Sequence, residues 1–331
     1  MRVVFMGTPD FSVPTLEKII EAGHEVVGVV TQPDKAKGRG KKVMYPPVKE
    51  KALEHHLTVY QPRRAREPEF IERMRALKPD VMVVVAFGQI LPKDLLDIPK
   101  YGCVNVHASL LPKYRGAAPI QWAVIRGEAV SGVTTMQMDV GLDTGDMLLK
   151  AEIPLDAEET GGSLHDKLST LGGDLLIETL KGLEAGTIQP EKQDDSQAGE
   201  YARMLDKNLG KIDFSMPAIE IERLIRGLNP WPSAYTSYNG KTMKLWKAEA
   251  IQNTEDGQTA GASEEGTSGS SNGKSTVPGY ILAVDKKGFT VQTGRGALRI
   301  LELQMEGKKR MDAGAFLRGC QMTAGEILGQ E

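Results

Sequence analysis

Short β-branched runs alternate with helix-length amphipathic segments over the first half of the chain, and this alternation is its strongest structural constraint. The expected strands lie at residues 3–6, 26–30, 81–85, 103–107 and 133–138, and the expected helices at 14–22, 68–77, 117–126 and 163–184. Repeated strand–helix units of this length are typical of a parallel sheet that helices cover on both faces. Residues 1–189 are therefore expected to form one α/β domain.

The second half has a different pattern. Residues 190–206 are polar and lack apolar periodicity, which predicts a linker. A helix is expected over 215–228, followed by five short strands with glycine-bearing turns, at 235–238, 242–246, 280–284, 289–292 and 298–303. This pattern predicts a small β-barrel domain over 207–331. Residues 252–276 contain no large apolar side chain, and we expect a disordered loop inserted between two strands.

The charge distribution gives a weak indication of a partner. The whole chain of 331 residues, a length suited to two domains, has a net charge of −3. Residues 207–331 carry 16 basic and 14 acidic residues, and their net charge is +5 when 252–276 are set aside. A basic second domain favours a polyanionic partner, but an ordinary solvated surface explains the charge equally well.

Several classes of protein are excluded by what the sequence lacks. Cys103 and Cys320 stand 217 positions apart, so neither a disulfide scaffold nor a cysteine-rich metal site is expected. No run of 18 apolar residues exists, and the amino end has no signal-peptide pattern, so we expect a cytoplasmic protein without membrane contact. The turn after the first strand keeps only Gly7 of a G-x-G-x-x-G fingerprint, and Pro9 interrupts it, which argues against a dinucleotide site.

Asn105 and His107 form the first candidate for catalysis. Alternate residues of a strand share a face, so both side chains should point the same way near the carboxyl end of a parallel strand. Ligands of open α/β sheets bind at that end. An amide N–H can hold a developing oxyanion, and an imidazole can move a proton near neutral pH. The alternative is an asparagine and a histidine at a strand end without a catalytic role.

The second candidate is the stretch MDVGLDTGD over 138–146. Its two glycines and three acidic residues predict a tight loop between two extended segments. A carboxylate from this loop could orient His107 and favour its charged form. The competing interpretation is an acidic turn in which glycine and aspartate serve only the turn geometry. No accompanying histidine or carboxylate spacing predicts a metal site here.

The third candidate is a basic loop over residues 32–42, QPDKAKGRGKK. It holds five basic residues and one acid, and it leaves a strand at the same sheet edge as Asn105 and His107. Such a loop is suited to a phosphate backbone, although a solvated loop without a partner has the same composition.

These stretches together resemble the methionyl-tRNA formyltransferase family. The resemblance is carried, in the family's order, by MGTPDFSVPTLEKI, TQPDKAKGRGKK, AFGQILP, NVHASLLPKYRGAAPIQWAVIRGE, GVTTMQMDVGLDTGDML, IRGLNPWPSAYT and LELQMEGKKRM. The SLLP core with Asn, His and Asp is shared more widely among enzymes that use 10-formyltetrahydrofolate. The basic loop and the second domain are more specific to the tRNA enzyme.

The resemblance implies a Rossmann-like formyltransferase catalytic domain (1–189), a linker (190–206) and an OB-like, tRNA-binding C-terminal domain (207–331). It implies transfer of the formyl group of 10-formyltetrahydrofolate, a co-substrate, to the amino group of methionine on initiator tRNA, without a metal. By motif match the catalytic positions are Asn105, His107 and Asp143. The folate-contacting segment is Ser109, Leu110, Leu111 and Pro112, and the tRNA-binding loop contributes Lys37, Arg39, Lys41 and Lys42. With one extended tRNA as partner, we expect a monomer.

The sequence departs from the family pattern in the linker, where Met204 replaces a lysine and Asn208 a glutamate. Any tRNA contact by this segment is therefore in doubt. Three competing functions remain open at this point. The closest is formyl transfer to a small amine, such as glycinamide ribonucleotide or an amino sugar; the others are a catalytically silent tRNA-binding module and a formyltetrahydrofolate hydrolase.

Overall fold

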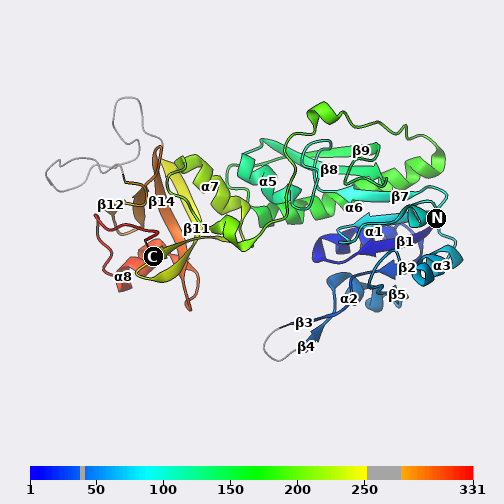
Figure 1. Ribbon diagram of the computed structural model, residues 1–331, viewed down its shortest axis with the longest axis horizontal. Coiled ribbons are helices and arrows are strands. Elements are labelled where there is room, and N and C mark those ends of the chain that lie inside the picture. The colour runs from blue at the N-terminus through cyan, green and yellow to red at the C-terminus, as the bar shows by residue number, and fades with distance from the viewer. Residues whose placement is uncertain (38–41, 252–276, 331) are drawn as a thin grey trace. The chain divides into compact units, whose positions relative to one another are not determined.

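The computed structural model describes residues 1–37, 42–251 and 277–330, and the chain folds into two compact units (Figure 1). The N-terminal unit comprises Met1–Ile120, Ala129–Leu155 and Ser163–Arg203. The C-terminal unit comprises Gln121–Glu128, Asp156–Gly162 and Met204–Glu331. The insert expected over 252–276 lies outside the described residues.

A seven-stranded sheet forms the centre of the N-terminal unit. Its strands are β1 (Arg2–Gly7), β2 (Glu25–Val30), β5 (Val59–Tyr60), β6 (Val81–Val85), β7 (Cys103–His107), β8 (Val130–Gln137) and β9 (Met147–Pro154). Their order across the sheet is β5-β2-β1-β6-β7-β8-β9. The first five strands are parallel, as the alternating pattern predicts.

The last two strands correct the expectation of an all-parallel sheet. β8 runs antiparallel to β7, and β9 runs antiparallel to β8. The loop that joins β8 to β9 spans only residues 138–146, which suits a hairpin but is too short for the crossover that a parallel pair requires. The Asp-rich loop therefore closes a hairpin at the sheet edge.

Helices cover both faces of this sheet. The helical segments of the N-terminal unit are η1 (Asp10–Ser12), α1 (Val13–Glu21), α2 (Pro47–Glu54), α3 (Pro68–Ala76), α4 (Lys93–Leu96), α6 (Gly161–Ala185, which enters this unit at Ser163) and η2 (Asp195–Gln197). α5 (Pro119–Arg126) belongs to the C-terminal unit from Gln121 onward. On one face Val4 and Met6 of β1 share a core with apolar residues of α3 and α4. On the other face α6 packs closely on β7 and β8, since a Cβ at Gly172 would lie 2.8 Å from Val106 Cγ1. Among the described residues no helix is long and apolar enough to cross a membrane.

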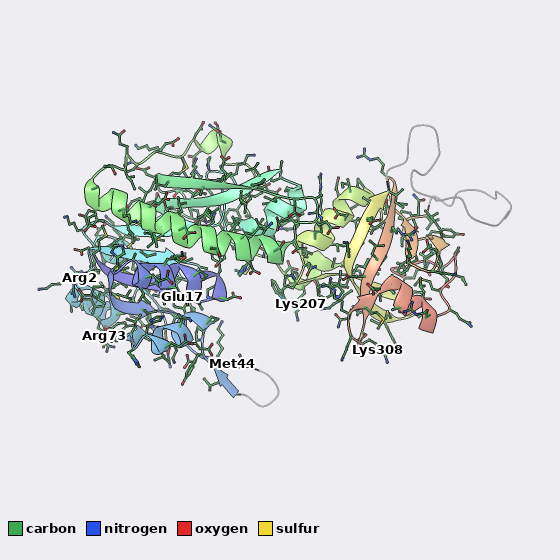
Figure 2. The ribbon with its side chains drawn as sticks, turned by 180° about the vertical axis from the view of Figure 1, so that it is seen from behind. Arg2, Glu17, Met44, Arg73, Lys207 and Lys308 are labelled. Atoms are coloured by element: carbon green, nitrogen blue, oxygen red, sulfur yellow. The ribbon has the colours of Figure 1, made fainter. Side chains whose placement is uncertain are left out.

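A two-stranded hairpin, β3 (Lys35–Lys37) with β4 (Lys42–Met44), extends from the N-terminal unit and ends at Met44 (Figure 2). A polar network fixes its base: Lys49 Nζ lies 2.7 Å from Asp34 Oδ2, and Gln61 Nε2 donates to Asp34 Oδ1 at 2.8 Å. The hydrogen bonds from Lys49 and Gln61 lower the pKa of the Asp34 carboxyl. The polypeptide between the strands, with Arg39 and Lys41, lies outside the described residues, as do the side chains of Lys37 and Lys42.

The C-terminal unit is built on an antiparallel sheet. Its elements are η3 (Lys207–Gly210), α7 (Ala218–Gly227), β10 (Ala234–Tyr238), β11 (Lys241–Ile251), β12 (Ile281–Val284), β13 (Phe289–Gln292), β14 (Ala297–Met305), β15 (Met311–Asp312) and α8 (Ala313–Gly319). The order β10-β11-β14-β13-β12, with β15 beside β14, includes all five strands that the sequence predicts. Ile221 and Ile225 of α7 bury against this sheet. α7 begins at Ala218 behind Pro217, three residues after the start expected at 215.

The two cysteines differ in accessibility, and neither forms a disulfide. Cys103 is 1% exposed in β7, and burial raises the pKa of its thiol to about 12. Since the thiolate is the reactive form, we expect a thiol reagent at pH 8 to label Cys320 in the native protein and to leave Cys103 unlabelled until the protein unfolds. Mass spectrometry of the labelled peptides measures this. Rapid native labelling of Cys103 would contradict the packing described for β7.

Candidate active site

The strand order marks the carboxyl edge of the parallel sheet as the place where a ligand is expected. The chain runs outward from β1 to β2 and β5, then returns to place β6 on the other side of β1, so the strand order reverses at β1. Ligands of open α/β sheets bind at such a reversal. The loops at this edge are tied together: Gln32 Nε2 and Thr8 Oγ1 both donate to the carbonyl oxygen of Phe87, at 3.1 Å each.

β7 carries Asn105 and His107 to this edge on one face of the sheet. Cys103, two residues earlier, packs into the core under α3 and α4, whereas Val106 faces α6. Residues 103, 105 and 107 therefore share the face opposite α6. Among the described residues no side-chain hydrogen bond occupies the Asn105 amide. Its N–H groups remain available to a ligand.

His107 is held between a carbonyl and a carboxylate. Its side chain is 7% exposed, its Nε2 lies 3.0 Å from the carbonyl oxygen of Tyr114, and its Nδ1 lies 3.8 Å from Asp143 Oδ1. A carbonyl only accepts, so Nε2 carries a proton and Nδ1 faces the carboxylate. The ring is thus oriented with Nε2 toward a backbone acceptor and Nδ1 toward a carboxylate.

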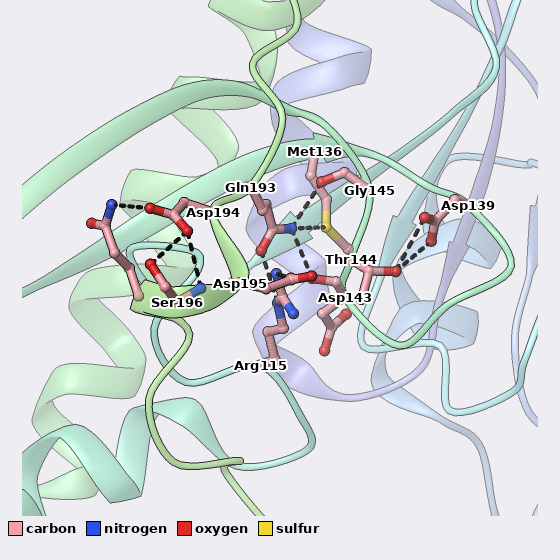
Figure 3. Close-up of polar contacts among 11 residues, drawn as sticks. Arg115, Met136, Asp139, Asp143, Thr144, Gly145, Gln193, Asp194, Asp195 and Ser196 are labelled. Atoms are coloured by element: carbon pink, nitrogen blue, oxygen red, sulfur yellow. Dashed lines mark hydrogen bonds and ion pairs between the residues drawn. The ribbon is translucent and has the colours of Figure 1, made fainter.

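The loop between β8 and β9 presents Asp143 in a constrained conformation. Its φ is +55°, in the left-handed region. For a residue other than glycine this conformation costs about 1 kcal/mol or more, and it persists where contacts with the surrounding structure offset that cost. The N–H of Gly116 donates to Asp143 Oδ2 at 2.9 Å. Thr144 Oγ1 donates to Asp139 at 2.9 Å (Figure 3). The Gly141 N–H donates to the same carboxylate at 2.9 Å, which closes the loop on itself. Asp139 thus shapes the loop, and Asp143 faces His107.

The segment that follows β7 is a buried turn. Ser109 Oγ donates to the carbonyl of Lys113 at 2.7 Å, and Thr134 Oγ1 donates to the carbonyl of Ser109 and accepts from the Leu111 N–H. Ser109 and Leu111 are almost fully buried, Leu110 and Pro112 are half-buried, and the Leu111–Pro112 peptide is cis. The side chain of Ser109 therefore shapes the turn.

Several residues that build this site do not stand out in the sequence. Tyr114 and Gly116 act through backbone groups, and Gln193 acts from a segment 50 residues beyond the loop that it contacts. Tyr114 and Gly116 lie within the stretch KYRGAAP, so that run marks their neighbourhood, but no side-chain chemistry marks their roles. No trio of His, Cys, Asp or Glu side chains in residues 1–37, 42–251 and 277–330 is arranged to hold a metal ion.

Both halves of the chain match families of known proteins. Residues 1–180 match the model of the formyl transferase family, and residues 204–321 match that of the formyl transferase C-terminal domain. Curated relatives named methionyl-tRNA formyltransferase are 57% identical over 330 residues in Lachnospira eligens (100% of each chain) and 52% identical over 330 residues in Clostridioides difficile (99% of this chain, 100% of the other).

Solved structures share the fold. An N-formyltransferase from Helicobacter canadensis, in complex with folinic acid and dTDP-3-aminofucose, matches with a TM-score of 0.63 at 20% identity, over 91% of this chain and 98% of that one. HypX from Aquifex aeolicus, in complex with tetrahydrofolic acid, matches with a TM-score of 0.60 at 17% identity, over 96% of this chain; this chain spans about half of that longer protein, 47%.

The chain is a formyl transferase by its matched families. The sheet topology and the pairing of His107 with Asp143 agree with that class. Identity of 50–57% over the full length places the chain more narrowly, and it belongs to the methionyl-tRNA formyltransferase family.

The loop geometry makes a glycine indispensable at position 145. A Cβ there would lie 1.7 Å from the carbonyl oxygen of Gln137, a backbone atom that cannot move aside cheaply. Gly145→Ala should therefore displace the Asp143 loop and lower formyl transfer about a hundredfold, since a shift of about 1 Å in a reacting group costs that much. Gly319→Ala, where a Cβ meets open space, is the control. Steady-state turnover checks this; unchanged turnover in Gly145→Ala would contradict the role given to the loop.

Proposed function

We propose that this protein transfers the formyl group of 10-formyltetrahydrofolate to the α-amino group of methionine on initiator tRNA, with Asn105, His107 and Asp143 as catalytic residues. One observation carries the assignment of the residues. His107 Nδ1 lies 3.8 Å from Asp143 Oδ1, and Asn105, whose amide makes no side-chain hydrogen bond to the described residues, lies on the same face of β7 as His107. The product, formylmethionyl-tRNA, serves translation initiation.

The reaction moves a proton from the attacking amine nitrogen to N10 of the folate, the atom that leaves the formyl group. The amine nitrogen forms a bond to the formyl carbon, the bond from that carbon to N10 of the folate breaks, and a proton of the amine finally resides on N10. An α-amino group has a reference pKa of about 7.7–8.0 and attacks only when unprotonated. Amine and formyl donor meet directly, so no covalent enzyme intermediate is needed.

Each catalytic side chain has a distinct task in this scheme. Asn105 donates an N–H to the formyl oxygen as that oxygen becomes negative, an interaction that stabilises the transition state more than the ground state. His107 takes the proton that the attacking amine gives up, on the Nδ1 that faces Asp143. Asp143 orients the imidazole and stabilises its positive charge.

The remaining contacts follow from the same arrangement. The turn beside His107 is assigned to folate contact, and it consists of Ser109, Leu110, Leu111 and Pro112. The Ser109 hydroxyl keeps this turn in shape, since it already donates a hydrogen bond to the carbonyl oxygen of Lys113. Lys37, Arg39, Lys41 and Lys42 are assigned to the phosphates at the acceptor end of the tRNA. The protein acts as a cytoplasmic monomer with one tRNA per chain, and residues 207–331 form an OB-like tRNA-binding domain.

Substitution of the catalytic residues tests the scheme. Asn105→Ala should lower kcat about a hundredfold to a thousandfold, the usual effect of losing one oxyanion donor, and His107→Ala and Asp143→Ala should each lower it strongly. Single-turnover formylation of charged initiator tRNA measures the chemical step, and thermal unfolding verifies that each variant folds. A variant with near-normal turnover would remove its residue from the scheme.

The basic loop is tested by the salt dependence of tRNA affinity. Each lost phosphate contact should reduce the slope of log K against log salt by about 0.7, the single-strand value, so Arg39→Ala and Lys42→Ala should both flatten it. Lys93→Ala is the matched control, because Lys93 is exposed and already paired with Asp97 at 2.8 Å. Unchanged slopes in both loop variants would show that the loop makes no phosphate contact.

The acceptor is tested by direct competition. Formyl transfer should be far faster to charged initiator tRNA than to free methionine, glycinamide ribonucleotide, an amino sugar nucleotide or water. The reason is that a small amine has no phosphate backbone for the basic loop to bind. Radiolabelled formyl transfer to each acceptor measures this. Preference for a small amine over the tRNA would reverse the proposed function.

A further inference from the structure

The segment 190–203 packs into the N-terminal unit beside the Asp143 loop. Glu191 and Met147 exchange two backbone hydrogen bonds at 2.8 Å, which adds this segment to the edge of β9. Further along, Ala202 N donates to the carbonyl of Arg115 at 2.8 Å, and Ala202 pairs with Gly116. The two attachments fix the segment at both ends, with Gln193 between them.

Gln193 uses its whole amide on the loop and its neighbour. Its Nε2 donates to the carbonyl oxygens of Asp143 and Gly145, at 2.8 Å each, and its Oε1 accepts from Arg115 Nε at 2.8 Å (Figure 3). Both N–H groups and the oxygen are therefore satisfied. The two carbonyls flank Thr144, so a single side chain bridges the turn in which Asp143 has its positive φ.

Arg115 completes the arrangement from the other side. Its guanidinium, with the side chain 14% exposed, also donates from Nη2 to Asp195 Oδ1 at 2.8 Å. The next residue, Gly116, donates its N–H to the Asp143 carboxylate. The backbone carbonyl and the carboxylate of Asp143 are thus held by one connected set of residues, Gln193, Arg115 and Gly116. We call this set the Asp143 clamp.

We propose that Gln193 is a positioning residue for catalysis, which through the Asp143 clamp sets the distance and orientation of the Asp143 carboxylate relative to His107 Nδ1. This inference rests on the proposed function of that pair. It makes part of the segment that precedes the C-terminal unit a component of the active site. The physical reason is that a left-handed aspartate keeps its conformation only where its surroundings fix it.

Two substitutions distinguish the effect of the Gln193 N–H donors from the effect of the size of its side chain. Gln193→Ala removes these three hydrogen bonds and the longer contact of Nε2 with Met136 Sδ at 4.0 Å. Gln193→Glu keeps the size and the acceptor for Arg115, but it places a carboxylate against two carbonyl oxygens to which it cannot donate. Both should lower kcat about ten- to a hundredfold and change KM for tRNA and for folate less than threefold. Gln197→Ala and Gln197→Glu are matched controls, because Gln197 lies in the same segment, is exposed and donates its side-chain hydrogen bond to Asp194 and not to the Asp143 loop.

A double-mutant cycle distinguishes positioning from general support of the fold. If Gln193 acts through Asp143, Gln193→Ala should lower kcat in the wild-type background but change it less than threefold in Asp143→Ala. Full additivity of the two losses, or a wild-type kcat in both Gln193 variants, would overturn the inference. Should Gln193→Ala fail to fold, Gln193→Glu answers the same question in the same cycle.

Amide hydrogen exchange tests the clamp without an activity assay. Peptides covering 139–147 should exchange faster in Gln193→Ala than in the wild type, and Gln197→Ala should leave them unchanged. A wild-type protein without formyl transfer would refute the proposed function, and unchanged exchange in Gln193→Ala would refute the clamp, so the two failures are distinguishable.

Discussion

The conformation of Asp143 is the constraint on which the geometry of the site depends. An aspartate with φ of +55° is stable only if several interactions hold it, and here the Gly116 N–H holds the carboxylate while Gln193 holds the carbonyl. His107 faces the carboxylate from β7 and is held on its other side by the carbonyl of Tyr114. These supports come from residues 114–116 and from Gln193, which are far apart in the sequence, so the site exists only when the N-terminal unit is folded.

The sheet topology explains why a loop of this kind can reach His107. β8 pairs antiparallel with β7, so the carboxyl end of β8 lies beside the amino end of β7, where Gln137 pairs with Val104. The loop after β8 must therefore run back along β7 before Asp143 faces the histidine. A β9 strand parallel to β8 would have required a helix-length crossover in place of this short loop. The departure from an all-parallel sheet is what brings the acidic loop to the site.

The likeness to structures at 17–20% identity has a physical basis in the same elements. What these structures share with the chain is the fold, in which the parallel core and the β8–β9 hairpin lie in one sheet. Hydrogen bonds among Asp34, Lys49 and Gln61 fix the base of the β3–β4 hairpin, from which the basic residues extend.

Local patterns in the sequence determined the elements, and only the tertiary structure decided how they meet. The β-branched run 81–85 predicts β6, and the helix-period segment 163–184 predicts α6 to within two residues. Both predictions succeed because the spacing of apolar residues along the chain indicates which side chains of a strand or helix are buried. Asn105, His107 and Asp143 are recognisable because their side-chain types and motif context suit carbonyl chemistry. The sequence did not predict the direction of β8, because pairing between distant segments is fixed by packing of the whole unit. Nor did it predict the hydrogen bond from the Gly116 N–H or the contacts of Gln193 with the Asp143 loop, because backbone donors and acceptors have no sequence signature.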